Sequence, residues 1–129
     1  MTDTEKFVFA DTEFDHQSQD CFNGVMRLGV SNVDQLMDAI ADALDFPAYF
    51  GANWNALSDC LTDFNWIDQR TVLLTHHEIP KINIYDLKTY LSVLQDAVDD
   101  WKDGEDHEFF VVFPASSEFG IRNLLQERG

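Results

Sequence analysis

Apolar residues recur at helical spacing in the first half of the chain. Between Ser31 and Phe46 they return every three or four positions while aspartates fill the opposite side, which is typical of a helix that packs one face on a core. The pair Ser31 and Asp34 predicts the start of this helix, and Pro47 predicts its end. We therefore expect an amphipathic helix with an acidic outer face.

Two more helices are predicted by the same spacing and by asparagines that can cap them. Asn53 is a suitable N-cap for a helix that runs to about Phe64. Asn83 can cap a longer helix with one continuous apolar stripe, which Gly104 terminates. The tail from Pro114 to Gly129 holds enough apolar residues for one short docked helix.

Short apolar runs rich in β-branched and aromatic residues predict strands. They lie at Glu5–Ala10, Thr71–Thr75 and Glu108–Phe113. Met26–Val30 either extends the first strand or pairs with it, and the pattern leaves both options open.

Strands that alternate with helices favour right-handed crossovers and a parallel sheet. The expected fold class is therefore α/β, with a three-stranded, mostly parallel sheet packed with about four helices. We expect a single domain over residues 1–129, with an insertion loop at 11–23 and a C-terminal extension at 115–129.

The charge of the chain limits its partners. The sequence has 24 acidic and 8 basic residues, a formal net charge of -16, and residues 28–69 contain no Lys or Arg. This balance argues against binding to nucleic acid or to an anionic membrane surface, both of which attract cations. Such a charge either keeps the protein in solution or attracts a basic partner, and charge alone does not separate these interpretations.

Other functional classes lack support in the sequence. The first residues are acidic and precede no apolar signal region, and no apolar run approaches a membrane span, so we expect a cytoplasmic protein with reduced Cys21 and Cys60. The cluster His76, His77 and Glu78 lacks zinc-site spacing and is expected in a solvated loop. Nucleotide-binding and hydrolase motifs are absent. We predict no catalytic residue, metal ion or cofactor.

The predicted helix after Asn53 divides cleanly into two halves on a helical wheel. One half is apolar, and the other carries the polar side chains Asn55, Ser58, Asp59, Thr62 and Asp63. Next to this polar half, the preceding loop offers the large aromatic residue Tyr49. An exposed aromatic beside carboxylates is typical of a protein-binding patch.

The segment from Pro47 to Thr62 reads PAYFGANWNALSDCLT, and it resembles the signature region of the barstar family. The matching elements are the proline, the two aromatics, the glycine, the asparagine and the later runs Ala-Leu and Asp-Cys-Leu-Thr. This resemblance implies a barstar-like fold and a small inhibitor whose loop and second helix face a ribonuclease. It extends more weakly to the order of the remaining elements.

The resemblance also implies roles for individual residues. Asp59 falls on the central acidic contact, whose carboxylate occupies the phosphate pocket of the nuclease. Tyr49, Gly51 and Asn53 match loop positions that touch the nuclease, although Gly51 and Asn53 also have local structural explanations. The other expected contacts lie on the same helix face or on the later helix: Asn55, Thr62, Asp63, Asp96 and Asp100.

The expected partner is a basic ribonuclease toxin, bound one to one by a monomer. Ala52, Asn55 and Ser58 stand where family members can carry acidic or large aromatic residues, so this face is flatter and less charged there. Two alternatives therefore stay open. In the first, the chain is an acidic interaction module for a partner that is not a nuclease. In the second, it is an immunity protein against a nuclease effector delivered between bacteria.

Overall fold

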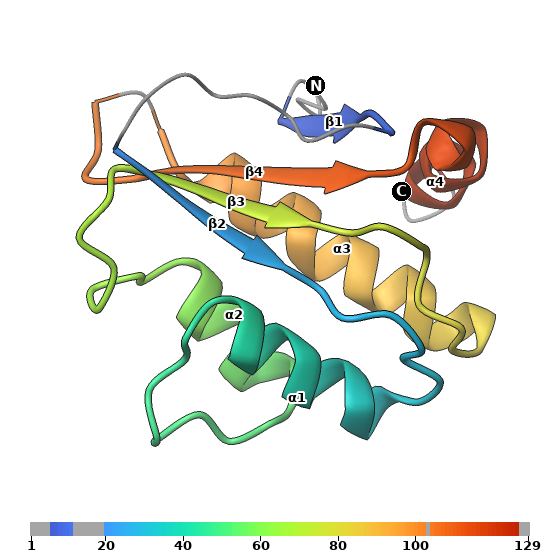
Figure 1. The fold of residues 1–129 in the computed structure, drawn as a ribbon, viewed down its shortest axis with the longest axis horizontal. Coiled ribbons are helices and arrows are strands. Elements are labelled where there is room, and N and C mark those ends of the chain that lie inside the picture. The colour runs from blue at the N-terminus through green and yellow to red at the C-terminus, as the bar shows by residue number, and fades with distance from the viewer. Residues whose placement is uncertain (1–5, 12–19, 103, 127–129) are drawn as a thin grey trace.

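The computed structural model describes residues 6–11, 20–102 and 104–126, and its centre is a parallel sheet (Figure 1). The sheet has four strands in the order β1-β4-β3-β2, and every neighbouring pair is parallel. The prediction of an α/β fold is confirmed, and the prediction of three strands is wrong by one. The strands are β1 Phe7–Phe9, β2 Cys21–Val25, β3 Thr71–Thr75 and β4 Glu108–Phe113.

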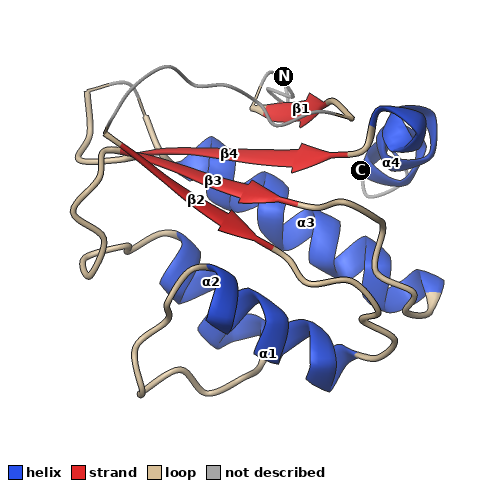
Figure 2. Ribbon diagram, viewed as in Figure 1, coloured by secondary structure: helices blue, strands red, loops and turns tan. Residues whose placement is uncertain are grey.

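Within the described residues, four α-helices accompany the sheet. They are α1 Val33–Ala43, α2 Trp54–Leu61, α3 Ile84–Asp100 and α4 Glu118–Gln126, with a 3-10 turn at Ala115–Ser117 before α4. Figure 2 shows α1, α2 and α3 on one side of the sheet, while α4 lies beyond the carboxyl end of β4. None of the helices in the described part of the chain is long and apolar enough to cross a membrane.

The additional strand is β2, which the sequence pattern does not predict. Residues 21–23 of the expected insertion loop belong to it, whereas Met26–Val30 forms no strand and leaves the sheet after the Met26 amide donates to Thr75 O of β3 at 2.8 Å. Gly24 is the reason that β2 fits here, because a Cβ at this position would collide with the backbone carbonyl of Ala43 in α1. Residues 12–19 of the expected insertion lie outside the described residues.

The strand that β1 pairs with in the sheet is far from it in the sequence. β1 pairs with β4, so that Phe7 lies opposite Val111 and the two ends of the chain meet along one edge of the sheet. The Asp11 carboxylate accepts a hydrogen bond from the Ala115 amide at 3.1 Å, and the Arg122 guanidinium lies 5.1 Å from the centre of the Phe9 ring. These contacts join β1 to the segment that leads into α4.

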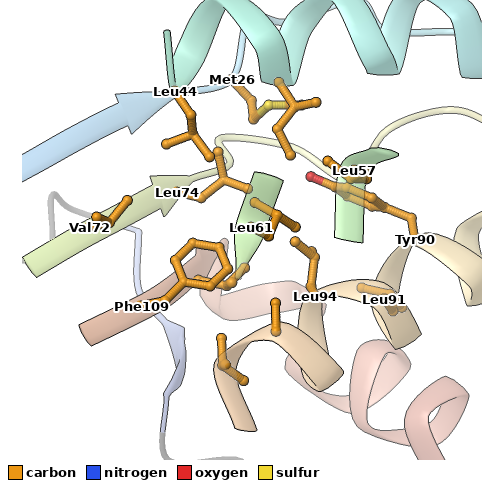
Figure 3. Close-up of a cluster of buried hydrophobic side chains, with 14 of the residues drawn as sticks. Met26, Leu44, Leu57, Leu61, Val72, Leu74, Tyr90, Leu91, Leu94 and Phe109 are labelled. Atoms are coloured by element: carbon orange, nitrogen blue, oxygen red, sulfur yellow. The ribbon is translucent and has the colours of Figure 1, made fainter. Parts of the chain in front are cut away.

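The core lies between the sheet and the helix layer. Figure 3 shows Leu61 from α2, Leu74 from β3, Leu94 from α3 and Phe109 from β4 within one apolar cluster, and all four are fully buried. Their burial excludes water from the inner face of the sheet, which is the main source of stability in such a layer.

Asparagine side chains cap the N-terminal ends of α1, α2 and α3, the three helices that lie on one side of the sheet. The side chains of Asn53 and Asn83 accept hydrogen bonds from Ala56 N and Asp86 N, as predicted from the sequence. For α1 the cap is Asn32, one residue after the predicted Ser31. The α2 helix ends at Leu61, earlier than predicted, because Phe64 takes a left-handed backbone conformation with φ of 53°.

The prediction of a solvated loop at residues 76–78 is wrong for its first residue. His76 is only 1% exposed, and its ring stacks on Phe113 with centroids 4.0 Å apart. Nε2 lies 2.6 Å from the Tyr90 hydroxyl and Nδ1 lies 3.0 Å from the Val112 carbonyl. His76 continues the inward alternation of Val72 and Leu74 and belongs to the core.

Candidate functional site

The polar half of α2 faces outward in the structure. Asn55, Asp59 and Asp63 are exposed, whereas Leu57 and Leu61 are fully buried on the opposite side. The α2 helix is thus oriented as its amphipathic pattern predicts, and Asp59 lies on its outer face in the last turn.

Thr62 behaves differently from the other residues of this face. It is half-buried, and its hydroxyl donates to Ser58 O at 2.9 Å and lies 3.3 Å from Asp59 O. These bonds occupy the hydroxyl at the C-terminal end of α2, where free carbonyls need donors. The geometry gives Thr62 a capping role in addition to its place beside Asp59.

The loop before α2 folds back toward this face. Tyr49 is 68% exposed, and partial desolvation of its hydroxyl, followed by the negative charge of Asp63, raises the Tyr49 pKa. The aromatic residue therefore lies within electrostatic reach of the acidic side chain. Behind it, Phe50 packs edge-on against Phe46 with centroids 4.8 Å apart, which anchors the loop in the apolar layer.

The residues between this loop and α2 serve the helix start. The Asn53 side chain accepts a hydrogen bond from Ala56 N at 2.8 Å, and its amide lies 3.4 Å from Gly51 O. Both Gly51 and Asn53 are exposed. The left-handed backbone in this segment belongs to Ala52, with φ of 54°, and not to the glycine beside it.

The helices α1, α2 and α3 all end where the strands begin (Figure 1). The last turns contain Asp42 in α1, Asp59 in α2 and Asp100 in α3, and none of the three contains a basic residue. The C-terminal end of a helix is negative, so a carboxylate there is unfavourable by about 0.3–1 kcal/mol. Asp42 has an exposed ion pair with Arg27 at 2.9 Å. This end of the molecule is therefore suited to a cationic partner.

The acidic end of α3 adjoins that of α2. Asp96 and Asp100 are exposed on α3. Directly after them, the buried Trp101 indole donates to Leu61 O at 2.9 Å and so joins the two helix ends. The structure brings Tyr49 close to Asp63, and it sets Asp96 and Asp100 on the neighbouring helix end.

The chemistry of these residues favours binding. Burial, followed by the charges of Asp63 and Asp59, raises the pKa of the Cys60 thiol, so the thiol is protonated and a poor nucleophile at neutral pH. Within the ranges that the structure describes, no three His, Cys, Asp or Glu residues are grouped as metal ligands. Exposed carboxylates around an aromatic ring are suited to charge-assisted hydrogen bonds with basic groups.

Comparison with known proteins identifies this arrangement. A family model described as "Barstar (barnase inhibitor)" matches residues 26–114, which is more than half of the chain. The chain belongs to the barstar family. It is also similar to a Bacillus subtilis (strain 168) protein named "Putative ribonuclease inhibitor YrdF", with 40% identity over 77 residues, or 56% of this chain and 79% of that protein.

The match to the barstar family covers α1, α2, β3, α3 and β4. It therefore includes the whole of the acidic helix ends and the Tyr49 loop. β1, β2 and α4 lie outside the matched region of this barstar-family chain. The edge formed by β1 and α4 is thus an addition to the part that carries the candidate site.

Sequence reasoning missed two residues that shape this site, Trp66 and Trp101. Their indole groups donate to carbonyls at the ends of α1 and α2. The sequence holds a partial signal, because buried tryptophans require a partner for their N–H group. The identity of that partner depends on contacts between residues 22 and 40 positions apart, which no local pattern encodes.

Proposed function

We propose that this barstar-family chain inhibits a small basic ribonuclease by placing Asp59 in the active site of the enzyme. The observation that carries the proposal is the exposed Asp59 carboxylate in the last turn of α2, where no basic side chain accompanies it. Tyr49, which lies within electrostatic reach of Asp63, and Asp63 itself are also exposed. The family match and the name of the Bacillus subtilis relative support a role in ribonuclease inhibition.

The mechanism follows from the chemistry of ribonucleases. Their active sites use cationic side chains to stabilise the negative charge that develops on a phosphate during cleavage. The same side chains form short, charge-assisted hydrogen bonds with a carboxylate. Asp59 would then replace a pair of phosphate oxygens, and occupation of the pocket would exclude RNA.

The other carboxylates act mainly on the rate of association. Exposed charges such as Asp96 and Asp100 would meet basic residues at the rim of the nuclease, where water screens them. Such charges raise the association rate constant and make it sensitive to salt more than they strengthen the final complex. Replacing both residues by asparagine should therefore slow association and flatten its salt dependence.

A titration against a panel of small basic ribonucleases tests the proposal. Asp59→Asn keeps the shape of the side chain and removes its charge. It should raise the Kd by about tenfold to a hundredfold for one lost charge-assisted hydrogen bond. Asp34→Asn is the matched control, because it removes one exposed carboxylate at the start of α1, at the opposite end of that helix from the site.

Two results would contradict the proposal. The first is that no ribonuclease of the panel is inhibited by the wild-type protein. The second is an equal affinity of the Asp59→Asn and Asp34→Asn variants. We further propose a one-to-one complex with a monomeric inhibitor in the cytoplasm, which the stoichiometry of the titration and cell fractionation would check.

One observation favours a second candidate function. Asn55 is neutral, and Ser58 is small and half-buried. The first half of the outer face of α2 therefore offers a nuclease neither a charged group nor a large side chain to contact. An acidic interaction module with a partner that is not a nuclease would tolerate this. If the chain inhibits no ribonuclease but binds another basic protein through Asp59, this second function holds. Inhibition of a nuclease encoded beside the gene would instead favour immunity.

A further inference from the structure

Two tryptophans cap helices of the candidate site with neutral groups. The Trp66 indole donates to the carbonyl of Leu44, the C-cap residue of α1, at 3.0 Å. The Trp101 indole donates to the carbonyl of Leu61, the last residue of α2, at 2.9 Å. The carbonyls at the end of a helix lack partners within the helix, and glycine turns or basic side chains commonly satisfy them. Here two indoles from distant segments do so.

The same two rings belong to a continuous aromatic row. Phe50 packs on Phe46, Phe46 on Trp66, Trp66 on Phe64, and Phe64 on Trp101, with centroids between 4.8 and 6.0 Å apart. Phe64 and Trp101 are stacked within 3° of parallel. The row begins at Phe50, next to the exposed Tyr49 in sequence. It ends at Trp101, the C-cap residue of α3.

Each part of the candidate site therefore rests on one of these indoles. Trp66 holds the segment between α1 and α2, which carries Tyr49. Trp101 holds the end of α2, which carries Asp59, against the end of α3, which carries Asp100. Its own carbonyl accepts a hydrogen bond from the Lys6 ammonium group at 3.0 Å, which fixes it from the other side.

We propose that Trp66 and Trp101 are positioning residues of the interaction face, which they hold in its binding conformation through their indole N–H groups. This inference rests on the proposed function. A lysine or arginine could satisfy the same carbonyls, but its charge would cancel part of the negative potential that a basic partner needs. At the ends of α1 and α2 a neutral indole satisfies the carbonyl without adding positive charge, whereas at the end of α3 Lys6 and Lys102 donate to the carbonyls of Trp101 and Asp99.

A face that is held in place before binding loses less conformational entropy when the complex forms. Removing an indole N–H should therefore accelerate dissociation. The association rate constant should stay constant, because the charges that steer encounter are unchanged. Separate measurement of the two rate constants distinguishes this role from a change in electrostatics.

Trp66→Phe and Trp101→Phe remove the donors and keep an aromatic ring. Tyr90→Phe is the matched control, because it removes one buried hydrogen bond, to His76, away from the acidic face. All three variants should lower the urea midpoint of unfolding. Only the two tryptophan variants should raise the Kd for the inhibited ribonuclease, by about tenfold and through the dissociation rate constant. Equal Kd values for all three would overturn the proposal.

Amide hydrogen exchange tests the positioning without any nuclease. In Trp66→Phe the amides of Phe46 and Phe50, which bond to Ala41 O and Pro47 O, should exchange faster than in Tyr90→Phe. In Trp101→Phe the same should hold for the amides of Thr62 and Asp63, which bond to Ser58 O and Cys60 O. Uniform exchange that only follows global stability would refute the proposal.

The two proposals can fail separately. If the wild-type protein inhibits no ribonuclease, the proposed function fails, and the exchange pattern alone decides whether the indoles hold the loop and the helix ends. If a phenylalanine variant does not fold, replacing Trp66 by 3-benzothienylalanine keeps the shape of the double ring and removes only the N–H donor. An unchanged dissociation rate constant and unchanged exchange in that variant would overturn the positioning role.

Discussion

His76 links the stability of the fold to pH. Its ring is buried between Phe113 and Tyr90, and desolvation lowers its pKa from 6.5 to about 4, although a hydrogen bond to the Val112 carbonyl opposes this shift. Nδ1 donates to that carbonyl, so Nε2 accepts from the Tyr90 hydroxyl and the ring is neutral. Below pH 6.5 the unfolded chain binds a proton on this residue that the folded protein does not.

The magnitude follows from the two pKa values. Each tenfold change in a protonation equilibrium is worth about 1.4 kcal/mol, so a pKa lowered from 6.5 to about 4 corresponds to about 3 kcal/mol. The sign is destabilising in acid, because protons bind preferentially to the unfolded state. Relative to neutral pH, stability falls as the pH drops from 6.5 to about 4, and the contribution of His76 is constant outside this window. A loss of this size is a large part of the stability of a typical domain.

Urea unfolding, followed by tryptophan fluorescence between pH 4 and pH 8, measures the effect. The 24 acidic residues also titrate at low pH, so wild type must be compared with a variant that shares them. His76→Asn keeps a donor near the position of Nδ1 and cannot become charged. The wild type should lose about 3 kcal/mol relative to this variant between pH 7.5 and pH 4.

An equal difference in unfolding free energy between wild type and His76→Asn at pH 4 and pH 7.5 would exclude this role of His76. A direct NMR titration gives a second check. The imidazole signals of His76 should not change above about pH 5.

Three further substitutions test the local geometry. Asn53→Ala removes the oxygen that caps α2 at Ala56 N, and it should lower the unfolding free energy by about 1 kcal/mol, measured as a lower urea midpoint at constant slope. Gly24→Ala forces a methyl group toward the Ala43 carbonyl and should cost about 1–3 kcal/mol, so an unchanged Tm would contradict the close packing of β2 on α1. Ala52→Gly relieves a left-handed backbone and should raise the urea midpoint, corresponding to about 0.5–1 kcal/mol.

The sequence predicts those strands and helices whose own residues show a clear strand or helix pattern. The strands Thr71–Thr75 and Glu108–Phe113 are apolar runs of β-branched and aromatic residues, and the helix caps Asn53 and Asn83 precede clear amphipathic stripes. β2 lacks such a signal, because its sequence Cys-Phe-Asn-Gly-Val contains two residues that disfavour strands. It is a strand because β3 pairs with it and because its glycine admits α1 at close range.

In the candidate site, too, some features could be predicted from the sequence and others could not. The outward direction of Asp59 and Asp63 follows from a helical wheel and could be predicted. The internal use of the Thr62 hydroxyl and the bond between Trp101 and Leu61 could not, because they depend on where each helix ends and which segment meets it there. His76 had a usable signal in the alternation of Val72 and Leu74, which its polar neighbours obscured.

The pairing of β1 with β4 also affects how the chain is made. Phe7 and Val111 are 104 positions apart, so the partner strand of β1 leaves the ribosome long after β1 itself. At about 5–20 residues per second this delay is on the order of 5–20 s. During that time Phe7–Phe9 is an apolar segment without its neighbour, open to capture by chaperones or by other nascent chains. The protein therefore completes its sheet only after β4 has been synthesised and has closed the gap between β3 and the first strand.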